Sequence, residues 1–336
     1  MNRTNPPAGH IRRPSRTARP WVESLDGRQL LSGLAPHPAP HREVAATPSA
    51  AMVLGLPTAI NHAHLGRIIS DITYNRHGSQ SLKLDLYLPS GSPPPGGWPV
   101  ILAFPGDGWR QADRKDYGGA VSVLTDYGYA VEGVDTTYAK DSGGHTWPTN
   151  LEDARAAVRW TRAHSGRFGL NPAKVVAMGE SAGAHVALLL GTDPGDPTSG
   201  GSAQVQAVVD FYGPTDLATL YAESRPEVRP FFGTFLGGLP SQYPTRYADA
   251  SPINHVSAST PPTLIMQGLI DRTVLPSQSF ELDAALTAAG VRHRLVTFDG
   301  ITHGFRFSLG GYSLLPDVVG FLDGALNGGS LGRRTG

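Results

Sequence analysis

The chain has 336 residues, with 28 basic and 28 acidic side chains, no formal net charge and 40% apolar residues. This composition supports a sizeable core, and the neutral charge argues against nucleic acid as the main partner, because phosphate binding needs a surplus of Lys and Arg. The absence of cysteine excludes disulfides, thiolate metal sites and a cysteine nucleophile. Apolar runs such as residues 186–190 are far shorter than the roughly 18–20 residues that span a bilayer, so no membrane span is expected.

Residues 1–65 are expected to form a disordered leader. Residues 1–45 carry seven Arg against three acidic side chains, and the first 60 residues hold nine of the 29 prolines. Such a segment buries too little surface to offset its ordering entropy. Residues 19–32 resemble an element found near the N-termini of many extracellular proteins, although the apolar region typical of a signal peptide is missing. We expect export to the periplasm or the extracellular space, with a cytoplasmic location as the alternative.

Residues 66–327 are expected to form one domain in which strands alternate with helices. Residues 82–88 alternate apolar and polar side chains, as in a half-buried strand, and residues 100–104 are apolar throughout, as in a strand covered on both faces. Further strands are predicted at 129–134, 174–178, 205–211, 263–266 and 292–298, and helices at 150–167 (capped by Asn150), 182–190, 277–289 and 316–326. This alternation predicts a mostly parallel sheet with helices on both faces. A Gly/Arg-rich tail follows at 328–336.

Residues 214–250, between two predicted strands, are longer than a plain crossover and are rich in proline and aromatic residues. Long insertions above the carboxyl edge of a sheet often cover a functional site. We therefore expect this insertion to be a partial cover, with simple surface packing as the alternative.

The strongest chemical signal is the sequence GESAG at residues 179–183, which fits the pattern G-x-S-x-G. A predicted strand precedes it and a predicted helix follows. A serine at such a strained turn needs small residues two positions before and after it, and the N-terminus of the helix favours negative charge developing beside the hydroxyl. Ser181 is therefore predicted to be a nucleophile rather than an incidental serine in a glycine-rich turn.

A serine nucleophile needs a base, and the base needs an acid that orients it. With this motif, both follow the serine in the chain, the acid before the histidine, at the carboxyl ends of strands. Asp271, after the strand at 263–266, is the predicted acid, and His303, after the strand at 292–298, is the predicted base. Asp299 is expected to shape the turn before His303.

The other histidines are not predicted to react. His185 lies four residues after Ser181 on the same predicted helix, where packing or a hydrogen bond is expected. The remaining histidines lack a metal-binding spacing such as H-E-x-x-H. The sequence therefore predicts neither a metal nor a cofactor.

Acyl transfer also needs hydrogen-bond donors for the oxyanion. The predicted donors are the backbone N–H groups of Ala182, Gly106 and Asp107, the last two in the sequence PGDGW. Trp109 and Tyr138 are predicted to line the substrate pocket.

Asp107 carries a negative charge at a position where that charge would repel the negatively charged oxyanion. We expect its carboxylate to turn away, toward Arg110 or Arg114, so that only its N–H serves the reaction. Three roles for the carboxylate stay open: stabilisation of the loop through a hydrogen bond from a neighbouring N–H, a direct role in choosing substrates, and impairment of the oxyanion hole.

Several of these motifs together resemble the α/β-hydrolase esterases related to hormone-sensitive lipase, most closely the bacterial bifunctional feruloyl/acetyl-xylan-esterase-like branch. The resemblance runs from about residue 67 to 326 and includes DLYLP, EDARAAVRW, GESAGAH, VQAVVDFYGP and THGF. It implies an α/β-hydrolase fold, the triad Ser181, Asp271 and His303, and no cofactor. The sequence PGDGW departs from the family's HGGGW, and Gln267 stands where His is usual, so the oxyanion loop and acyl pocket are less well defined by the resemblance than the triad.

The expected function is that of a serine carboxylesterase acting on short-chain acyl or aryl esters, including small molecules and carbohydrate-linked acetyl or feruloyl esters, through an acyl-enzyme. One alternative is a serine peptidase of the prolyl-oligopeptidase type, although no propeller-sized domain precedes the hydrolase region here. The other is a non-catalytic binding module on the same fold, against which the intact triad argues. The oligomeric state is not indicated by the sequence.

Overall fold

A computed structural model describes residues 43–45, 65–139, 146–198 and 200–329. Almost all of the predicted leader at 1–65 and of the predicted tail at 328–336 therefore lies outside the described residues, as does the element on which the expectation of export depends. Within the described part of the chain, no helix is both long and apolar enough to cross a bilayer.

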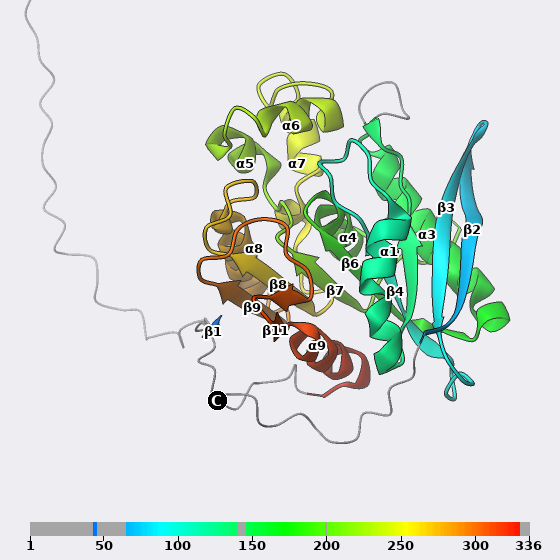
Figure 1. The fold of residues 1–336 in the computed structure, drawn as a ribbon. Helices are drawn as coiled ribbons and strands as arrows, with labels where there is room; N and C mark the ends of the chain where they lie inside the picture. The colour runs from blue at the N-terminus through cyan, green and yellow to red at the C-terminus, as the bar shows by residue number, and fades with distance from the viewer. Residues whose placement is uncertain (1–42, 46–64, 140–145, 199, 330–336) are drawn as a thin grey trace, which may run out of the picture. The chain divides into compact units, whose positions relative to one another are not determined.

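A nine-stranded sheet forms the centre of the unit from Arg42 onward, in the order β1-β9-β8-β7-β6-β4-β5-β3-β2 (Figure 1). Its strands are β1 (Glu43–Ala45), β2 (Leu65–His77), β3 (Gln80–Pro89), β4 (Trp98–Phe104), β5 (Ala130–Val134), β6 (Leu170–Glu180), β7 (Ala207–Phe211), β8 (Thr263–Gly268) and β9 (His293–Phe298). Strand β3 runs antiparallel to β2 and β5, and the other pairings in the sheet are parallel. The prediction of a mostly parallel sheet is confirmed.

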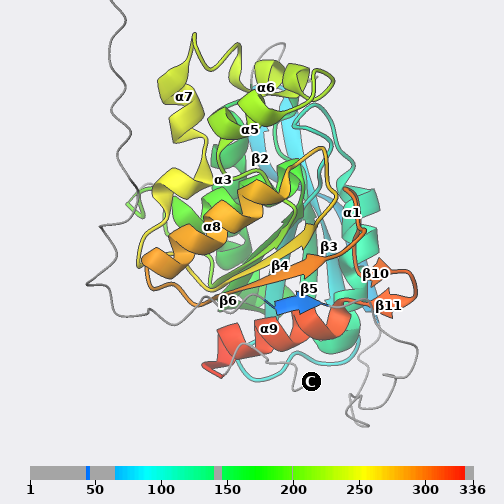
Figure 2. The ribbon, with the colours of Figure 1, turned by 90° about the vertical axis from the view of Figure 1, so that its left-hand side faces the viewer.

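Helices cover both faces of this sheet, as predicted (Figures 1 and 2). The helices are α1 (Arg114–Val121), α3 (Thr149–Phe168), α4 (Ala182–Thr192), α5 (Leu217–Glu223), α6 (Arg229–Leu236), α7 (Pro244–Asp249), α8 (Pro276–Ala288) and α9 (Leu315–Asn327), with 3₁₀ turns η1 (Ser122–Tyr127) and η2 (Pro252–His255). Strand β4 shows why both faces are covered. Its Val100, Leu102 and Phe104 share one core with α3, α4 and α8, while Ile101 and Ala103 share the other with α1 and α9. A two-stranded hairpin, β10 (Ser308–Leu309) and β11 (Tyr312–Ser313), precedes α9.

The structure differs from the sequence analysis at β1, α3 and β2. Strand β1 lies within residues 1–65, which were expected to be disordered, and its backbone pairs with β9. Helix α3 begins at Thr149 with Pro148 as its N-cap, so Asn150 lies in the first turn and does not cap the helix. Strand β2 was not predicted. It lies at the edge of the sheet, Tyr74 is its buried side chain, and bulges interrupt its register near Asp71. A strand of this kind lacks the regular alternation that identifies β3.

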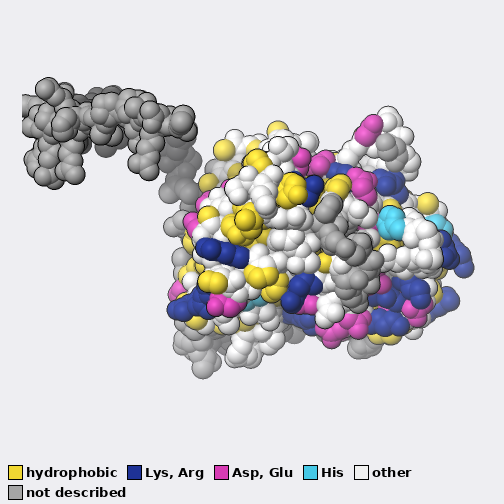
Figure 3. Space-filling model, turned by 90° about the horizontal axis from the view of Figure 1, so that it is seen from above, with side chains coloured by type: hydrophobic (Ala, Val, Ile, Leu, Met, Phe, Trp, Pro, Cys, Tyr) yellow, Lys and Arg dark blue, Asp and Glu magenta, His cyan; other side chains and the backbone are white. Residues whose placement is uncertain are grey.

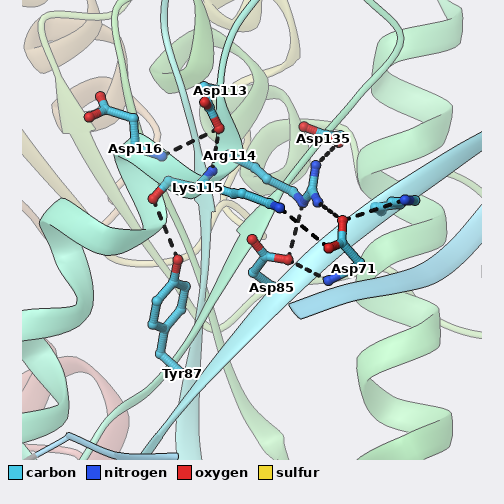
Figure 4. A network of polar contacts seen from close by, with 9 residues as sticks. Asp71, Asp85, Tyr87, Asp113, Arg114, Lys115, Asp116 and Asp135 are labelled. Atoms are coloured by element: carbon cyan, nitrogen blue, oxygen red, sulfur yellow. Dashed lines mark hydrogen bonds and ion pairs between the residues drawn. The ribbon is translucent and has the colours of Figure 1, made fainter. Parts of the chain in front are cut away.

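Arg114, the first residue of α1, anchors this helix to three strands (Figure 4). Its Nη2 lies 2.6 Å from Oδ1 of Asp71 on β2, its Nε 3.3 Å from Oδ1 of Asp85 on β3, and its Nη1 2.6 Å from Oδ2 of Asp135 after β5. Helix α1 directly follows the segment that contains the predicted oxyanion loop, and this network fixes where that segment ends.

Residues 214–250 form α5, α6 and α7, which lie together at the end of the sheet where the parallel strands terminate (Figure 1). Aromatic side chains hold this insertion together: the ring of Phe232 contacts those of Tyr221 and Tyr247. The ring of Phe235 stacks on Trp109 of the loop after β4, with ring centroids 4.4 Å apart. The insertion is thus a packed layer above the strand ends, as expected for a partial cover.

Candidate active site

Ser181 lies at the sharp turn between β6 and α4, with φ 52° and ψ −122°. The glycines two positions on either side make this turn possible. A Cβ on Gly179 would lie 2.3 Å from the carbonyl carbon of Gly183, and a Cβ on Gly183 would lie 2.0 Å from the carbonyl oxygen of Phe104. The spacing G-x-S-x-G therefore reflects the close approach of the strand, the helix and the end of β4 around the serine.

The structure brings the three residues of the predicted triad into one hydrogen-bonded line. Oγ of Ser181 lies 2.9 Å from Nε2 of His303, and Nδ1 of His303 lies 2.7 Å from Oδ2 of Asp271. Asp271 is only 2% exposed, and its Oδ1 accepts hydrogen bonds from the backbone N–H groups of Thr273 and Val274. An acceptor-only carboxylate requires the proton on Nδ1, which leaves Nε2 free to accept the serine proton.

Two further residues hold the acid and the base in place. Nε2 of Gln267 donates to the carbonyl oxygen of Gly268 at 3.0 Å and lies 3.5 Å from Oδ2 of Asp271. The ring of Tyr212 lies against that of His303 with centroids 4.6 Å apart, and its hydroxyl donates to the carbonyl oxygen of Phe305 at 2.6 Å. The sequence analysis noted Gln267 only as a departure from the family pattern. No pattern in the sequence predicted that Tyr212 would contact His303.

The loop after β4 lies beside the serine and carries the predicted oxyanion donors. Asp107, Gly108 and Trp109 have successive positive φ angles of 73°, 59° and 59°. Gly106 and Asp107 line the same cavity as Ser181 and Ala182. The structure therefore places all three predicted donor residues next to the nucleophile.

The carboxylate of Asp107 forms an ion pair with Arg110, with Oδ1 3.3 Å from Nη2. Both side chains are nearly half exposed, which reduces the influence of their charges on the cavity. The expectation that this carboxylate turns toward an arginine is confirmed for Arg110. Arg114, the other candidate, is occupied by the carboxylates of the network at α1.

The cavity in front of Ser181 has a volume of about 550 Å³, and we call two chemically different groups of its lining side chains its walls. One wall is apolar and includes Trp109 and the insertion side chains Leu220, Val228, Phe231 and Phe232. The other is polar and includes Glu180, Tyr212, Arg306 and Ser308. Figure 3 looks onto this end of the molecule, where hydrophobic side chains gather over one half of the face and charged ones lie mainly over the other.

Residues 84–286, well over half of the chain, match the family model BD-FAE. The chain belongs to the BD-FAE family. This finding agrees with the resemblance that the motifs indicated.

Among the relatives of this BD-FAE chain, Esterase LipQ of Mycobacterium tuberculosis is 31% identical over 68% of this chain and 55% of its own length. The chain spans about half the length of the curated relatives it matches. A thermophilic esterase, Est2, from the planctomycete Thermogutta terrifontis is 27% identical over 71% of this chain and 84% of that structure, with a TM-score of 0.58. A truncated carbohydrate esterase from gut microbiota, 23% identical, covers 79% of this chain and 98% of its own with a TM-score of 0.69, which shows a shared fold. The α/β-hydrolase fold is confirmed.

Tyr138 does not line the cavity in front of Ser181. It lies beside the loop after β4, where it lines a separate space of only about 10 Å³ together with Thr136 and Asn150. Burial raises the pKa of its phenol well above the usual value. The prediction that Tyr138 lines the substrate pocket is therefore wrong for the cavity in front of Ser181, whereas Trp109 does line this cavity.

His185 is fully buried on α4 and contacts Trp109 of the loop after β4. Its Nδ1 accepts a hydrogen bond from Nε1 of Trp109 at 3.3 Å, and its Nε2 donates to the carbonyl oxygen of Ala250 at 2.7 Å. Burial lowers the pKa of this histidine to about 4, so it is neutral at pH 7 and can fill both roles. The prediction that it packs and hydrogen-bonds is confirmed.

The described residues contain no group of three or more His, Asp or Glu side chains arranged to hold a metal ion.

Proposed function

We propose that this BD-FAE chain is a serine carboxylesterase that hydrolyses esters of short acyl groups, including aryl esters and acetyl or feruloyl esters of small or carbohydrate-linked alcohols. The observation that carries the proposal is the hydrogen-bonded line from Ser181 through His303 to buried Asp271, open to a cavity of about 550 Å³. The relatives named as esterases support the same reaction class.

In the proposed mechanism, Nε2 of His303 removes the proton from Ser181 as its Oγ attacks the ester carbonyl. Asp271 stabilises the imidazolium that forms, because its carboxylate lies against Nδ1. The backbone N–H groups of Ala182, Gly106 and Asp107 bind the oxyanion. His303 then protonates the leaving alcohol, and a water molecule repeats the sequence on the acyl-enzyme.

The first test is the variant Ser181→Ala. It removes one oxygen from a turn whose shape is set by its glycines, so the melting temperature should change by at most about 2 °C. Turnover of p-nitrophenyl acetate should fall by at least about 10³-fold, since removing one member of such a unit removes most of the chemical step. Ser165→Ala on α3, which removes one hydroxyl bonded to the carbonyl oxygen of Arg162, is the matched control.

Ester turnover by Ser181→Ala at the rate of the Ser165→Ala control would show that Ser181 is not the nucleophile. Comparison of p-nitrophenyl acetate with the corresponding anilide separates an esterase from a peptidase, since an amide hydrolysed as fast as the ester would favour the peptidase. Absence of turnover of both compounds by the unmodified protein would favour a binding module.

A further inference from the structure

The pair formed by Glu180 and Arg306 lies at the edge of the cavity and takes no part in the mechanism above. Glu180 immediately precedes Ser181, and Arg306 follows His303 by three residues. The two side chains meet in a bidentate pair, with Nε 2.9 Å from Oε2 and Nη2 3.0 Å from Oε1. A pair of this geometry fixes the plane of the guanidinium as well as its position.

Other contacts hold this guanidinium from further sides. Its Nη2 also lies 3.2 Å from Oδ2 of Asp116, and its Cζ lies 5.4 Å from the centre of the Tyr117 ring. The hydroxyl of Tyr212 lies 3.2 Å from Oε2 of Glu180. Arg306 is therefore preorganised, so a ligand that binds it need not immobilise a flexible side chain.

One nitrogen of this guanidinium remains available. Among the described residues, Nη1 of Arg306 has no hydrogen-bond partner, and it is not one of the buried polar atoms left without a partner. The side chain is 37% exposed and lines the cavity that contains Ser181. Nη1 thus offers two N–H donors that the described part of the chain does not use.

The position of this donor identifies the part of the substrate that it faces. In ester hydrolysis the leaving oxygen must lie next to Nε2 of His303, which protonates it. Gly304, Phe305, Arg306 and Ser308 continue from His303 along one loop and line the same cavity. The leaving alcohol therefore lies beside this polar loop, and the apolar wall of the insertion is left for the acyl group.

We infer that the Glu180–Arg306 pair forms the subsite for the leaving alcohol, where Nη1 of Arg306 donates to a hydroxyl or ether oxygen, so that esters of neutral, hydroxylated alcohols are preferred over esters of alkyl alcohols. This inference rests on the proposed esterase function.

The local charge favours a neutral alcohol over an anionic one. The positive charge of Arg306 is opposed by the two carboxylates of Glu180 and Asp116, so the cluster has a net charge of −1. A carboxylate on the alcohol would have to approach this net negative charge, whereas a hydroxyl needs only the free N–H groups.

The test compares three acetate esters that share one acyl group: glycerol 1-acetate, propyl acetate and O-acetyl-lactate. The first two leaving alcohols have three carbons each and differ by two hydroxyl groups, and the third carries a carboxylate. Acetate release gives kcat/KM for each ester. Because the hydrogen bond comes from a charged donor, we expect the unmodified protein to prefer glycerol 1-acetate over propyl acetate by about tenfold or more. We expect O-acetyl-lactate to be the poorest substrate, because its carboxylate must approach the net negative charge.

The decisive variant is the double substitution Glu180→Gln with Arg306→Gln. Removal of Arg306 alone would leave the carboxylate of Glu180, which is 14% exposed, unpaired beside Ser181 and would slow every substrate. The double variant removes both charges together, and its ratio of kcat/KM for glycerol 1-acetate to that for propyl acetate should fall to about one. Arg76→Gln, at the distant β2–β3 hairpin, is the matched control and should keep the original ratio.

A double variant that folds and keeps the original ratio would overturn the assignment, as would an unmodified protein that does not prefer glycerol 1-acetate. Equal or faster hydrolysis of O-acetyl-lactate would overturn the preference for a neutral alcohol. These outcomes differ from failure of the proposed function itself, in which the unmodified protein would hydrolyse none of the three esters, nor p-nitrophenyl acetate.

Discussion

Replacement of Gly183 by alanine tests how closely α4 must approach the end of β4. The added Cβ would lie 2.0 Å from the carbonyl oxygen of Phe104, 2.5 Å from its carbonyl carbon and 2.6 Å from the carbonyl oxygen of Pro105. All three atoms are backbone, so no side-chain rotation can relieve the contact. The helix and the strand end must move apart by roughly 1.4 Å to restore an ordinary contact of 3.4 Å.

This displacement would move Gly106 and Asp107, the proposed oxyanion donors after β4, away from Ser181. Phe104 and Pro105 lead directly into Gly106 and Asp107, whereas Gly183 follows Ser181 on the other side of the contact. A misplacement of about 1 Å between reacting groups can cost about 100-fold in rate. We therefore expect Gly183→Ala to lower kcat for p-nitrophenyl acetate by about 100-fold or more. Overpacking of a rigid site by one methyl group should cost about 1–3 kcal/mol, which corresponds to a melting temperature lower by roughly 3–10 °C.

The assay pairs steady-state kinetics with thermal unfolding followed by circular dichroism. Gly320→Ala on α9 is the matched control, because a Cβ there meets no atom within 4 Å and the backbone φ is not positive. Alanine should stabilise that helix by about 0.5–1 kcal/mol and leave kcat unchanged. If Gly183→Ala kept kcat within threefold and its melting temperature within 1 °C of the unmodified protein, the contact with β4 would not position the oxyanion loop.

Two further predictions concern pH and two fully buried groups. Burial raises the pKa of Glu132 to about 8, so the stability that the protonated group provides is complete below about pH 4.5 and is lost as the pH rises toward 8. Glu132→Gln should therefore raise the melting temperature at pH 8.5 more than at pH 4. Burial lowers the pKa of His185 to about 4, so stability is lost as the pH falls from 6.5 toward 4. In His185→Gln, the amide can accept a hydrogen bond from Trp109 and donate one to Ala250. This variant should lose less stability over that pH range than the unmodified protein. Melting temperatures measured from pH 4 to 9 check both, and curves parallel to that of the unmodified protein would contradict them.

The positions of Ser181, Asp271 and His303 could be predicted because their constraints are local. Each follows a strand that the sequence marks by its apolar run, and parallel strands deliver their carboxyl ends to one edge of the sheet. The glycines around Ser181 are required by backbone contacts within five residues and with β4. Such features leave a signal in a short stretch of sequence.

Other features have no such signal. Glu180 and Arg306 are 126 residues apart, and their pairing depends on the path of the loop after β9. Tyr138 follows β5 as expected, but the segment after that strand lies beside the loop after β4, so an aromatic residue close in sequence to the strand end lies outside the cavity. The edge strand β2 was missed because its exposed, bulged backbone lacks a two-residue period.

The insertion at residues 214–250 supplies most of the apolar wall of the cavity as one continuous segment of the chain. The apolar wall comes largely from one continuous segment with its own aromatic packing, whereas the serine, the histidine, the aspartate and the alcohol-side polar loop belong to the sheet and its connections. Exchange of α5 would change Leu220 in the apolar wall, whereas exchange of α6 would also remove Phe235, which stacks on Trp109 of the loop after β4. Under the proposed function, substitutions at Leu220 or Val228 would therefore change the space proposed for the acyl group without altering the Glu180–Arg306 pair.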